Sequence, residues 1–595
     1  MTEKNNVNAP KPREVIQKMA AYRPPLEGRR GLLRLDFNER TEGAPIEAIQ
    51  ALASITPDDL ATYPEYSPYI KVLSESLGVG EDCVLPTNAT DEAIQVVMLT
   101  YLDAGDKVLL ASPTFSMFAI YAQISGAEVV EVPYNPETLE FPSELYLEAL
   151  QDPSIKLAVA VDPNNPTATS VDPAVLRKIC ETRPDIPVLV DEAYGSFTGR
   201  TAIPMTETYS NLIVCQTFSK AFGLAGLRIG HLVSCPENIA NLSKVRSPYS
   251  VNLAAMAAAE ALIKAGAEKI PGTFVAKAMK GREMLVRGLE ERGFPIRSVG
   301  ANFVLTHVGS EHKALCQALR DRGILVRDRS SDRGLDGCVR VSAGSSEQME
   351  QFFSTLDAIF STRALLLDMD GTMVDVSRSY VSCDCKVATE FLEKAGIQAT
   401  VTEEDVQRLK AGGEGTNDDW VLTARLIQTK AKEHGQELQI PVSDIIPVYQ
   451  KYYHEEFAKT EEWIMPATLL KRLAKRYRLG IVTGRPRDEA LAALAYKGAD
   501  PSLFEVVITR DEVEPKLKPD PAGLLLALEQ MGCGAKGSLY VGDSADDMRA
   551  ARAAGVHAVG VIAPGDQPEM AREGLLQAGA QEIIEQIMEL EGLLL

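Results

Sequence analysis

The chain has 595 residues, which is too long for one hydrophobic core and predicts about three to four folding units. Hydrophobic residues make up 45% of it and charged residues 24%, a balance that excludes a disordered or fibrous protein. The formal net charge is -22, which excludes a general attraction to nucleic acid or to an anionic membrane surface.

Three further features narrow the class of protein: the cysteines, the histidines and the lack of long apolar segments. The nine cysteines form no CxxC pair, which indicates buried thiols in a reducing compartment, and six dispersed histidines argue against a histidine-based zinc site. Neither the N-terminus nor any later stretch approaches the ~20 apolar residues of a membrane span. We therefore expect a soluble, cytoplasmic enzyme whose partners include neither nucleic acid nor a membrane.

Four short apolar runs lie in the first part of the chain. They lie at 108–110, 157–161, 188–190 and 212–214, and Asp, Pro or Gly bounds each of them. Because these runs do not alternate with polar residues, they are typical of buried parallel strands, and the region is predicted to be α/β. An Ala-rich helix is expected from about residue 254 to 267, followed by helices and a few strands to about residue 360.

A lysine with hydroxyl neighbours follows the last of these runs. Lys220 stands after the hydroxyls of Thr217 and Ser219 and before the guanidinium of Arg228. A lysine amine can form the Schiff base with pyridoxal phosphate, while hydroxyls and a guanidinium hold its phosphate. Asp191 ends an earlier run, where its carboxylate could keep the pyridine nitrogen protonated. The pattern predicts a pyridoxal-phosphate site.

Three other parts of the sequence fit the same site. Asn165 and Tyr194 could both hydrogen-bond the phenolic oxygen of the cofactor ring. The stretch 87–92, Thr-Asn-Ala-Thr-Asp-Glu, precedes a predicted helix whose N-terminal N–H groups would face the phosphate.

In this order, the segments of residues 13–360 resemble the fold-type I aminotransferases, and most closely the histidinol-phosphate aminotransferase family. Beside the Lys220 segment, the resemblance rests on ATYPE at 61–65, SPTFSMF at 112–118, DEAY at 191–194 and RVSAG at 340–344. It implies a large and a small domain, pyridoxal 5'-phosphate as the cofactor, and glutamate and 2-oxoglutarate as the amino donor and its product. Two positions depart from the family, which usually has a glycine-containing loop at 88–90 and glycine where Ala168 stands.

The resemblance also implies roles for single residues. Lys220 would carry the cofactor and shuttle the proton, Asp191 would pair with the pyridine nitrogen, and Phe115 would stack on the ring. Tyr63 would reach the cofactor phosphate of a neighbouring subunit, which implies a homodimer. The residues that would hold the phosphate within one subunit are Thr90, Asp91, Thr217, Ser219 and Arg228.

For the substrate, the resemblance points to basic and aromatic side chains. Arg340 would bind the carboxylate of glutamate and, alternately, the phosphate of the imidazole substrate. Arg327 and Tyr22 are further candidates for that phosphate.

A second α/β pattern begins near residue 363. An apolar run at 364–367 leads into Asp368 and Asp370, a helix-rich insert follows at about 377–462, and strands return at 479–482, 506–508 and 539–541. The sequence therefore predicts two modules, residues 1–360 and 361–595, without a flexible linker between them.

Carboxylates and a lysine follow the strands of this second module. Asp368 can attack phosphorus, and Asp370 can protonate the leaving alcohol and then activate water. Asp543 offers a carboxylate to Mg²⁺, which prefers oxygen ligands. Lys518 supplies a fixed positive charge, and Thr483 supplies a hydroxyl and a backbone N–H to the transferring phosphoryl group.

This set resembles the four motifs of the haloacid-dehalogenase superfamily of phosphatases over residues 363–595. The resemblance implies a Rossmann-like domain with an α-helical cap, as in the phosphoglycolate-phosphatase subgroup. The implied Mg²⁺ site joins the carboxylates of Asp368 and Asp543 to the backbone carbonyl of Asp370, with Asp547 orienting Lys518. In the cap, the loop at 410–415 is a candidate for approaching the substrate, and a plain solvent turn is an equal alternative.

Together the two modules predict a bifunctional enzyme that acts on small phosphate esters. Transamination of imidazole-acetol phosphate with glutamate would give L-histidinol phosphate, and Mg²⁺-dependent hydrolysis would then give L-histidinol. Alternatives are a similar aminotransferase fused to a phosphatase of other specificity, such as phosphoglycolate, and a non-catalytic second module. A phosphonate aminotransferase fused to a phosphonoacetaldehyde hydrolase is disfavoured, because Asp370 is present and no alcohol leaves in that reaction.

Overall fold

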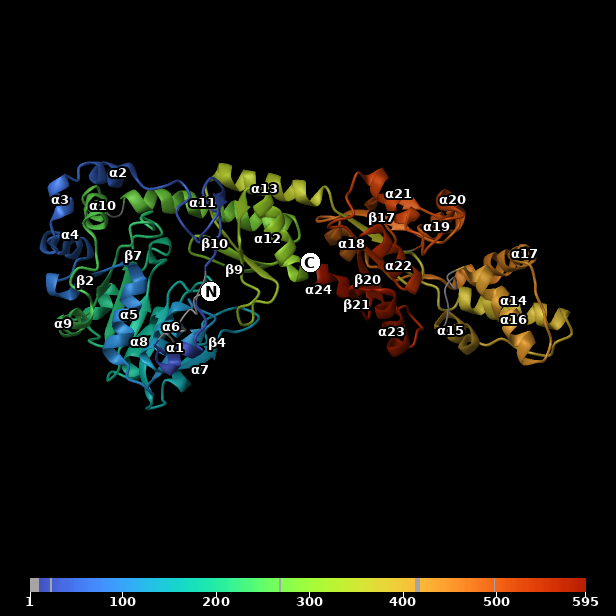
Figure 1. The fold of residues 1–595 in the computed structure, drawn as a ribbon, viewed down its shortest axis with the longest axis horizontal. Helices are drawn as coiled ribbons and strands as arrows, with labels where there is room; N and C mark the ends of the chain where they lie inside the picture. Colours follow the sequence, from blue (N-terminus) through green and yellow to red (C-terminus); the bar gives the residue numbers. More distant parts are fainter. Residues whose placement is uncertain (1–9, 22–23, 267–268, 412–417, 497, 595) are drawn as a thin grey trace, which may run out of the picture. The chain divides into compact units, whose positions relative to one another are not determined.

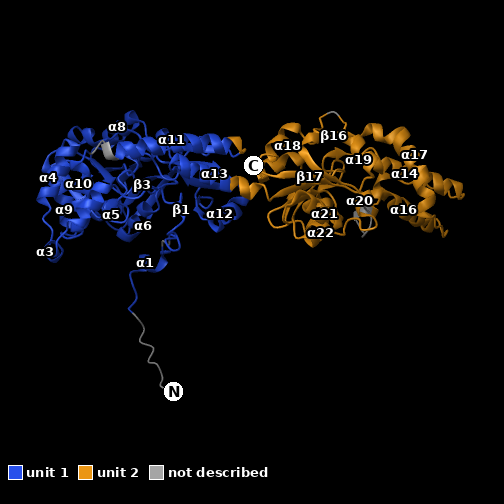
Figure 2. Ribbon diagram, turned by 90° about the horizontal axis from the view of Figure 1, so that it is seen from above, with its two compact units in different colours: residues 1–290, 294–355 blue, residues 291–293, 356–595 orange. Residues whose placement is uncertain are grey.

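The computed structural model describes residues 10–21, 24–266, 269–411, 418–496 and 498–594. The chain forms two compact units, residues 1–290 with 294–355, and residues 291–293 with 356–595 (Figure 2). The split after residue 355 falls within helix α13 (Ser346–Phe360), close to the predicted boundary at residue 360. The region near residue 363 then leads directly into strand β14 (Ala364–Leu367).

The first unit is built around a mostly parallel sheet (Figure 1). The four apolar runs predicted between residues 108 and 214 all lie in its strands, and β8 is antiparallel to both of its neighbours. Across the described part of the sheet, the order is β2 (Val84–Thr87), β8 (Gly230–Val233), β7 (Leu212–Thr217), β6 (Val188–Asp191), β5 (Ile155–Val161), β3 (Lys107–Ser112) and β4 (Glu128–Pro133).

The central strands of this sheet are buried on both faces, which explains why β5, β6 and β7 are mostly apolar, whereas the edge strand β4 is largely exposed. Leu110 packs in a core with Ile94 of α5, whereas the adjacent Leu109 packs in another core with Tyr146 of α7 and Ile179 of α8. The predicted Ala-rich helix is α10. The helices of the unit's first part are α1 (Glu14–Lys18), α2 (Ile46–Ala53), α3 (Pro57–Ala61), α4 (Ser67–Leu77), α5 (Ala89–Tyr101), α6 (Met117–Ser125), α7 (Ser143–Ala149), α8 (Pro173–Thr182), α9 (Pro236–Val245), α10 (Leu253–Lys264) and α11 (Lys269–Glu291).

A smaller, antiparallel sheet follows α11 in the sequence. Its order is β12 (Arg327–Asp328), β13 (Cys338–Ser342), β10 (Phe303–His307) and β9 (Ile296–Gly300), and α12 (His312–Asp321) lies between β10 and β12 in the chain. The N-terminal segment joins this region, because β1 (Leu33–Arg34) pairs with β11 (Ile324–Leu325). The pairing brings residues 35–38 next to the smaller sheet, where Leu35 O accepts a hydrogen bond from Ser342 N.

The second unit has a fully parallel sheet. Leu366 in the central strand β14 pairs with Gly480 on one side and Tyr540 on the other. The described strands, in order, are β18 (Phe504–Ile508), β17 (Arg478–Val482), β14, β19 (Leu539–Gly542), β20 (His557–Val561) and β21 (Glu582–Ile584). The accompanying helices are α18 (Ala467–Leu473), α19 (Arg487–Ala493), α20 (Arg510–Val513), α21 (Ala522–Met531), α22 (Ala545–Ala554), α23 (Pro568–Ala578) and α24 (Leu590–Leu594).

A helical cap interrupts this unit after its first strand. The chain enters and leaves the cap through a two-stranded ribbon, in which β15 (Val374–Asp375) pairs antiparallel with β16 (Glu462–Trp463). The cap has its own apolar core, which includes Val387, Leu422 and Ile445. Its helices are α14 (Tyr380–Lys394), α15 (Glu403–Ala411), α16 (Asp419–Glu433) and α17 (Val442–Tyr452).

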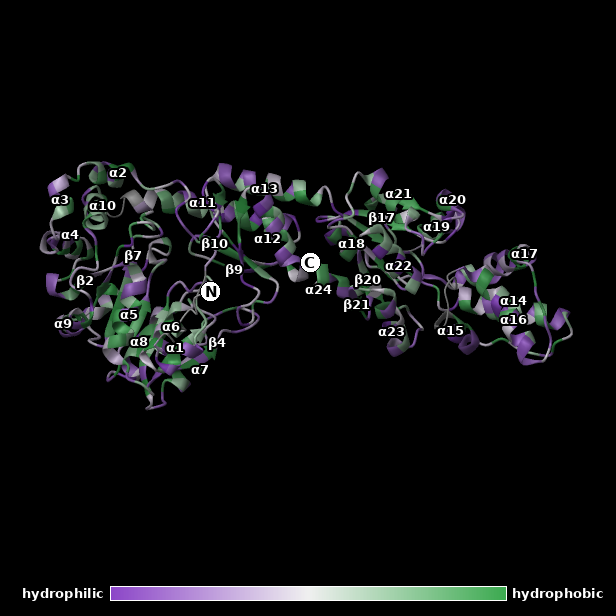
Figure 3. Cartoon of the chain, viewed as in Figure 1, coloured by the Kyte–Doolittle hydropathy of each residue, from purple (hydrophilic) through white to green (hydrophobic). Residues whose placement is uncertain are grey.

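The distribution of hydropathy follows this architecture. In Figure 3 the interior strands are green, whereas helices such as α13 carry both purple and green segments, as expected when one face is packed and the other is solvated. Across the described residues, no helix combines the length and apolar character needed to cross a membrane.

Candidate active sites

In the first unit, neighbouring strands deliver the predicted cofactor residues to one edge of the sheet. Asp191 is the last residue of β6, and Lys220 follows β7, the next strand. Asn165 follows β5 and Phe115 follows β3. Parallel strands place their carboxyl ends at the same edge, where open α/β sheets bind their ligands.

The amine of Lys220 is held beside the N-terminal segment. Its Nζ donates a hydrogen bond to the backbone oxygen of Phe37 at 2.9 Å and lies 5.5 Å from the centroid of the Tyr194 ring. The Tyr194 hydroxyl accepts a hydrogen bond from Asn38 Nδ2 at 3.0 Å. Asn38 and Phe37 were not among the predicted site residues, because their approach depends on the pairing of β1 with β11.

Asp191 is almost completely buried, with 3% of its surface exposed. Burial raises the pKa of its carboxyl from 3.8 to about 6, although hydrogen bonds from Ala193 N and the Cys215 thiol and the charge of Lys220 oppose the rise. Because burial disfavours the ionised carboxylate, a protonated ring nitrogen bound beside it would stabilise that ionised form. These residues therefore fit a pyridine ring at this edge.

The residues predicted to hold a phosphate lie together at the start of α5. Thr217 Oγ1 donates to Ser219 Oγ at 2.9 Å, and Arg228 NH1 donates to the same Ser219 oxygen at 3.4 Å. Arg228 NH2 also forms an ion pair with Asp91 Oδ2 at 2.6 Å. Thr90 lies beside Asp91 in the first turn of α5, whose N-terminal amides add positive potential. The cluster is suited to an anion.

Arg340 is a buried cation on β13, with 4% of its surface exposed. It donates to the backbone oxygen of Asp36 at 2.5 Å and to the side-chain oxygen of Asn165. Burial lowers the pKa of Arg340 to about 10. Arg327 on β12 is its direct partner across the antiparallel pair, so both predicted substrate arginines lie in one place.

The other predicted residues of this unit have different surroundings. Phe115 is half-buried and packs edge-to-face with Phe118, with ring centroids 6.3 Å apart. Tyr63 is 73% exposed and stacks on Tyr249 at a centroid distance of 4.4 Å. Tyr22 lies outside the described residues.

The two departures from the family pattern have a common conformation. Ala89 and Ala168 adopt φ values of 60° and 61°, in the left-handed region that favours glycine. Glycine is therefore the residue that the backbone prefers at both positions, and alanine is the smallest side chain that can replace it.

In the second unit, three adjacent strands end at the predicted phosphate site. Asp368 follows the central strand β14, Thr483 follows β17, and Asp543 follows β19. Lys518 Nζ lies 3.0 Å from Asp368 Oδ1 and 2.6 Å from Asp547 Oδ1. The buried Tyr540, which the sequence did not single out, donates from its hydroxyl to Asp547 Oδ1 at 3.1 Å.

Three carboxylates of this site can hold a cation. Oxygens of Asp368, Asp543 and Asp547 lie within 4.8 Å of one another. Burial and the neighbouring Asp547 and Asp370 raise the pKa of Asp368 to about 8 against the effect of Lys518, and burial also raises the pKa of Asp543. So much crowded negative charge fits Mg²⁺. The resemblance assigned Asp547 to orienting Lys518, and Asp547 Oδ1 does lie 2.6 Å from Lys518 Nζ. Its carboxylate is also close enough to those of Asp368 and Asp543 to share a cation with them.

The side chain of Asp370 is bound by an arginine for which the sequence suggested no role. Arg485 Nε donates to Asp370 Oδ1 at 2.7 Å, and Arg485 NH2 lies 3.0 Å from Glu461 Oε2, beside the ribbon strand β16. Arg485 is fully buried and also donates to the Tyr453 hydroxyl at 3.4 Å. Its place two residues after Thr483 was the signal that could have identified it.

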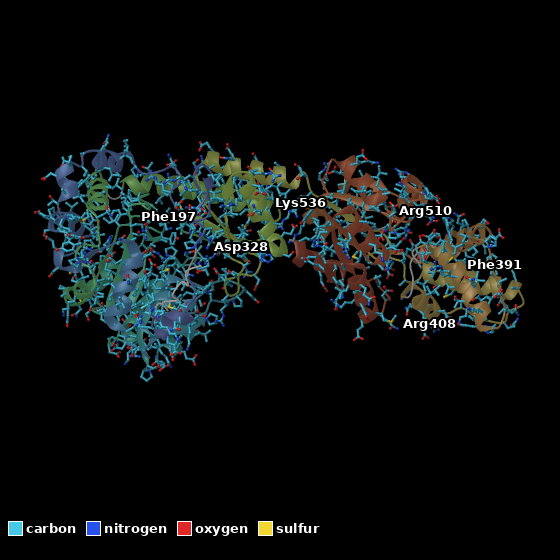
Figure 4. All side chains as sticks on the ribbon, in the orientation of Figure 1. Phe197, Asp328, Phe391, Arg408, Arg510 and Lys536 are labelled. Carbon is cyan, nitrogen blue, oxygen red and sulfur yellow. The ribbon has the colours of Figure 1, made fainter. Side chains whose placement is uncertain are left out.

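A cavity of about 170 Å³ lies between the catalytic carboxylates and the cap. Asp368, Asp370, Lys518 and Asp543 line it from the core of the unit. On its cap side, Arg510 of α20 (Figure 4) forms an ion pair with Asp418 at 3.0 Å and lies 4.3 Å from the centroid of the Trp420 ring. Cap and core thus enclose one space around the predicted nucleophile. Residues 412–415, which are most of the predicted substrate loop at 410–415, lie outside the described residues.

Comparison with known proteins assigns both halves of the chain. Residues 32–356 match the family model described as aminotransferase class I and II, and residues 365–561 match that described as haloacid dehalogenase-like hydrolase. The histidinol-phosphate aminotransferase of Caldanaerobacter subterraneus subsp. tengcongensis is 34% identical over 342 residues, which cover 55% of this chain and 93% of the relative. The chloroplastic enzyme of that name from Nicotiana tabacum is 35% identical over 332 residues, covering 55% and 78%.

Solved structures agree with the fold. The histidinol-phosphate aminotransferase of Sinorhizobium meliloti in complex with pyridoxal-5'-phosphate has a TM-score of 0.53 at 23% identity and covers 57% of this chain and 95% of that one. The Clostridium acetobutylicum structure of the same name has a TM-score of 0.51 at 21% identity and covers 55% and 99%. The matches confirm the predicted fold class and the fusion of an aminotransferase domain to a haloacid-dehalogenase-like domain.

Proposed function

Because this chain belongs to the class I and II aminotransferases through residues 32–356 and continues into a haloacid-dehalogenase-like hydrolase domain, we propose that it catalyses two consecutive reactions. The first is transamination of imidazole-acetol phosphate with glutamate, which yields L-histidinol phosphate and 2-oxoglutarate. The second is hydrolysis of that phosphate ester to L-histidinol. We propose pyridoxal 5'-phosphate and Mg²⁺ as the cofactors.

One observation carries the proposal. The first domain is similar to histidinol-phosphate aminotransferases over nearly their whole length, and the same chain holds a buried aspartate–lysine site suited to hydrolysing a phosphate ester. The ester that such an aminotransferase makes is the kind of molecule that such a hydrolase consumes.

In the aminotransferase site, pyridoxal phosphate would supply an electron sink for the carbon that loses its proton. Lys220 would move that proton, since its amine is held at the sheet edge by Phe37 O. Asp191 would bind the ring nitrogen, and the cluster of Ser219 and Arg228 would bind the phosphate. Arg340, already bonded to Asn165, would orient the carboxylate of glutamate.

In the hydrolase site, Asp368 would attack phosphorus while Asp370 gives a proton to the leaving alcohol oxygen. Asp370 would then take a proton from water as the water attacks the phosphoaspartate, which releases phosphate and restores Asp368. Lys518 would offset the charge of the transferring group. Mg²⁺ would be held by Asp368 and Asp543, with Asp547 beside them.

The experiment is Mg²⁺-dependent phosphate release from L-histidinol phosphate, compared with phosphoglycolate and other small phosphate esters. A clear preference for L-histidinol phosphate, together with transamination that forms it, would establish both steps. A strong preference for another ester would break the link between the two domains.

Two variants serve as matched controls. Asp368→Asn should abolish phosphate release and leave transamination intact, whereas Lys220→Ala should do the converse. A folded Asp368→Asn protein that loses both activities would contradict two independent sites, and a Lys220→Ala protein that still transaminates would refute the role of Lys220.

A further inference from the structure

The cap presents an acidic and aromatic wall to the hydrolase cavity. Among the described cap residues that line the cavity, the polar and aromatic ones include Tyr380, Asp418, Asp419, Trp420 and Tyr449, and none is lysine or arginine. This wall lines the same cavity as Asp368, so it would surround the alcohol part of a phosphate ester whose phosphate is bound at Asp368.

The positive charges of this cavity come from the core of the unit, and each is bound to carboxylates. Lys518 contacts Asp368 and Asp547, Arg485 contacts Asp370 and Glu461, and Arg510 contacts Asp418. A negatively charged leaving group would have to compete with these protein carboxylates for its cation.

Glu489 adds a buried carboxyl to the same cavity. It is 8% exposed and accepts a hydrogen bond from the Tyr380 hydroxyl at 3.2 Å, while His454 Nε2 lies 3.8 Å away. Burial raises the pKa of Glu489 to about 7, against the lowering effect of Arg485. A cation bound in the cavity would stabilise the ionised form of Glu489.

We propose that this cavity selects phosphate esters whose alcohol carries an ammonium group, and that Asp419 and Glu489 recognise that group. The inference rests on the proposed phosphatase function and names its substrate class. The aromatic rings of this cavity already lie against positive charge: Arg510 Cζ is 4.3 Å from the Trp420 ring centroid and Arg485 Cζ is 5.3 Å from the Tyr380 ring centroid. A cationic leaving group is therefore compatible with an aromatic wall of this kind. An alcohol that carries a carboxylate would meet repulsion on the same wall.

The test uses three esters of similar size that differ in the charge of the leaving group: ethanolamine phosphate, ethyl phosphate and phosphoglycolate. We expect kcat/KM to fall in that order, by about tenfold or more between the first and the last. Asp419→Asn and Glu489→Gln should each raise KM for ethanolamine phosphate about tenfold and leave ethyl phosphate nearly unchanged.

Matched controls remove the same charge outside the cavity. Asp444 in α17 and Asp488, the neighbour of Glu489, are both exposed, so Asp444→Asn and Asp488→Asn should preserve the order of the three esters. Preference for phosphoglycolate, or equal losses with all three esters in Asp419→Asn and Glu489→Gln, would overturn the proposal.

A binding measurement separates this inference from the phosphatase function. Trp420 lines the cavity and is one of two tryptophans in the chain, so titration with L-histidinol should change its fluorescence. The affinity should fall in Asp419→Asn and Glu489→Gln but not in the two control variants. If no ester is hydrolysed but this pattern holds, the hydrolase assignment fails and amine recognition stands. Equal affinity in all variants would refute amine recognition whatever the hydrolase activity.

Discussion

At the scale of single residues, the burial of Asp191 at the cofactor site lowers the stability of the folded protein. Its carboxyl lies among buried strand residues, and its pKa is raised from 3.8 to about 6. In the unfolded chain the group loses its proton at a lower pH than in the folded protein. Above about pH 4 the folded state therefore becomes progressively less stable relative to the unfolded state, by about 3 kcal/mol once the pH exceeds 6.

Asp191→Asn removes this pH-dependent cost from the cofactor-free protein. We expect its free energy of unfolding to exceed that of the wild type by up to about 3 kcal/mol above pH 6, with no such gain at pH 4. Denaturant unfolding of the first unit between pH 4 and pH 8 measures the difference. The exposed Asp336, replaced by Asn, is the control and should show no such trend. A gain for Asp191→Asn that is constant with pH would contradict the effect of burial.

At the scale of the element, helix α16 joins the cap to the hydrolase cavity. Asp418 caps its N-terminus, because Oδ1 accepts hydrogen bonds from the backbone N–H groups of Trp420 and Val421. The other carboxylate oxygen pairs with Arg510 of the core. One side chain therefore serves both the helix and the contact across the cavity.

Two substitutions of Asp418 should separate these roles. Asn is a good N-cap but carries no charge, so Asp418→Asn should weaken the contact with Arg510 and keep the helix start ordered. Asp418→Ala should lose both and cost about 1 kcal/mol more. Hydrogen exchange of the first turn of α16 is the measurement: faster exchange in the alanine variant than in the asparagine variant is expected, and identical exchange would contradict the capping role.

The elements also show which parts of the sites the sequence could predict. Asp191, Asp368 and Asp543 end or follow apolar strands, and a strand end in a parallel sheet fixes the edge at which a side chain lies. Strand β8 was not among the predicted strands, and its antiparallel direction leaves no mark in the sequence, because a buried strand is apolar in either direction.

The sequence could not predict the contacts between distant segments. Arg485 reaches Asp370 across 115 positions, and Arg510 reaches Asp418 across 92. No local pattern links such pairs. Arg485 meets Asp370 because β17 and β14 are neighbours in the sheet, and Arg510 meets Asp418 only after the cap has folded over the core. The hydrogen bond from Lys220 to Phe37 O, 183 positions away, depends in the same manner on the pairing of β1 with β11.

At the scale of the whole molecule, we propose a homodimer formed through the aminotransferase unit. Tyr63, predicted to reach the cofactor phosphate of the neighbouring subunit, is 73% exposed in the single chain, and its stacking partner Tyr249 is 61% exposed. Light scattering after size exclusion should give about twice 64.6 kDa. Tyr63→Phe should keep that mass and weaken cofactor binding through loss of the hydroxyl. A monomer with full cofactor affinity would contradict the arrangement.

The ribbon of β15 and β16 has a consequence for how this protein can change. Val374 lies opposite Trp463 and Asp375 opposite Glu462, so the two ends of the cap insert stand side by side. An insert with adjoining ends can be exchanged for another without moving the strands that carry the nucleophile. Evolution can therefore replace the cap as a unit, and with it the alcohol that the site accepts. The residues that react with the phosphate then stay unchanged.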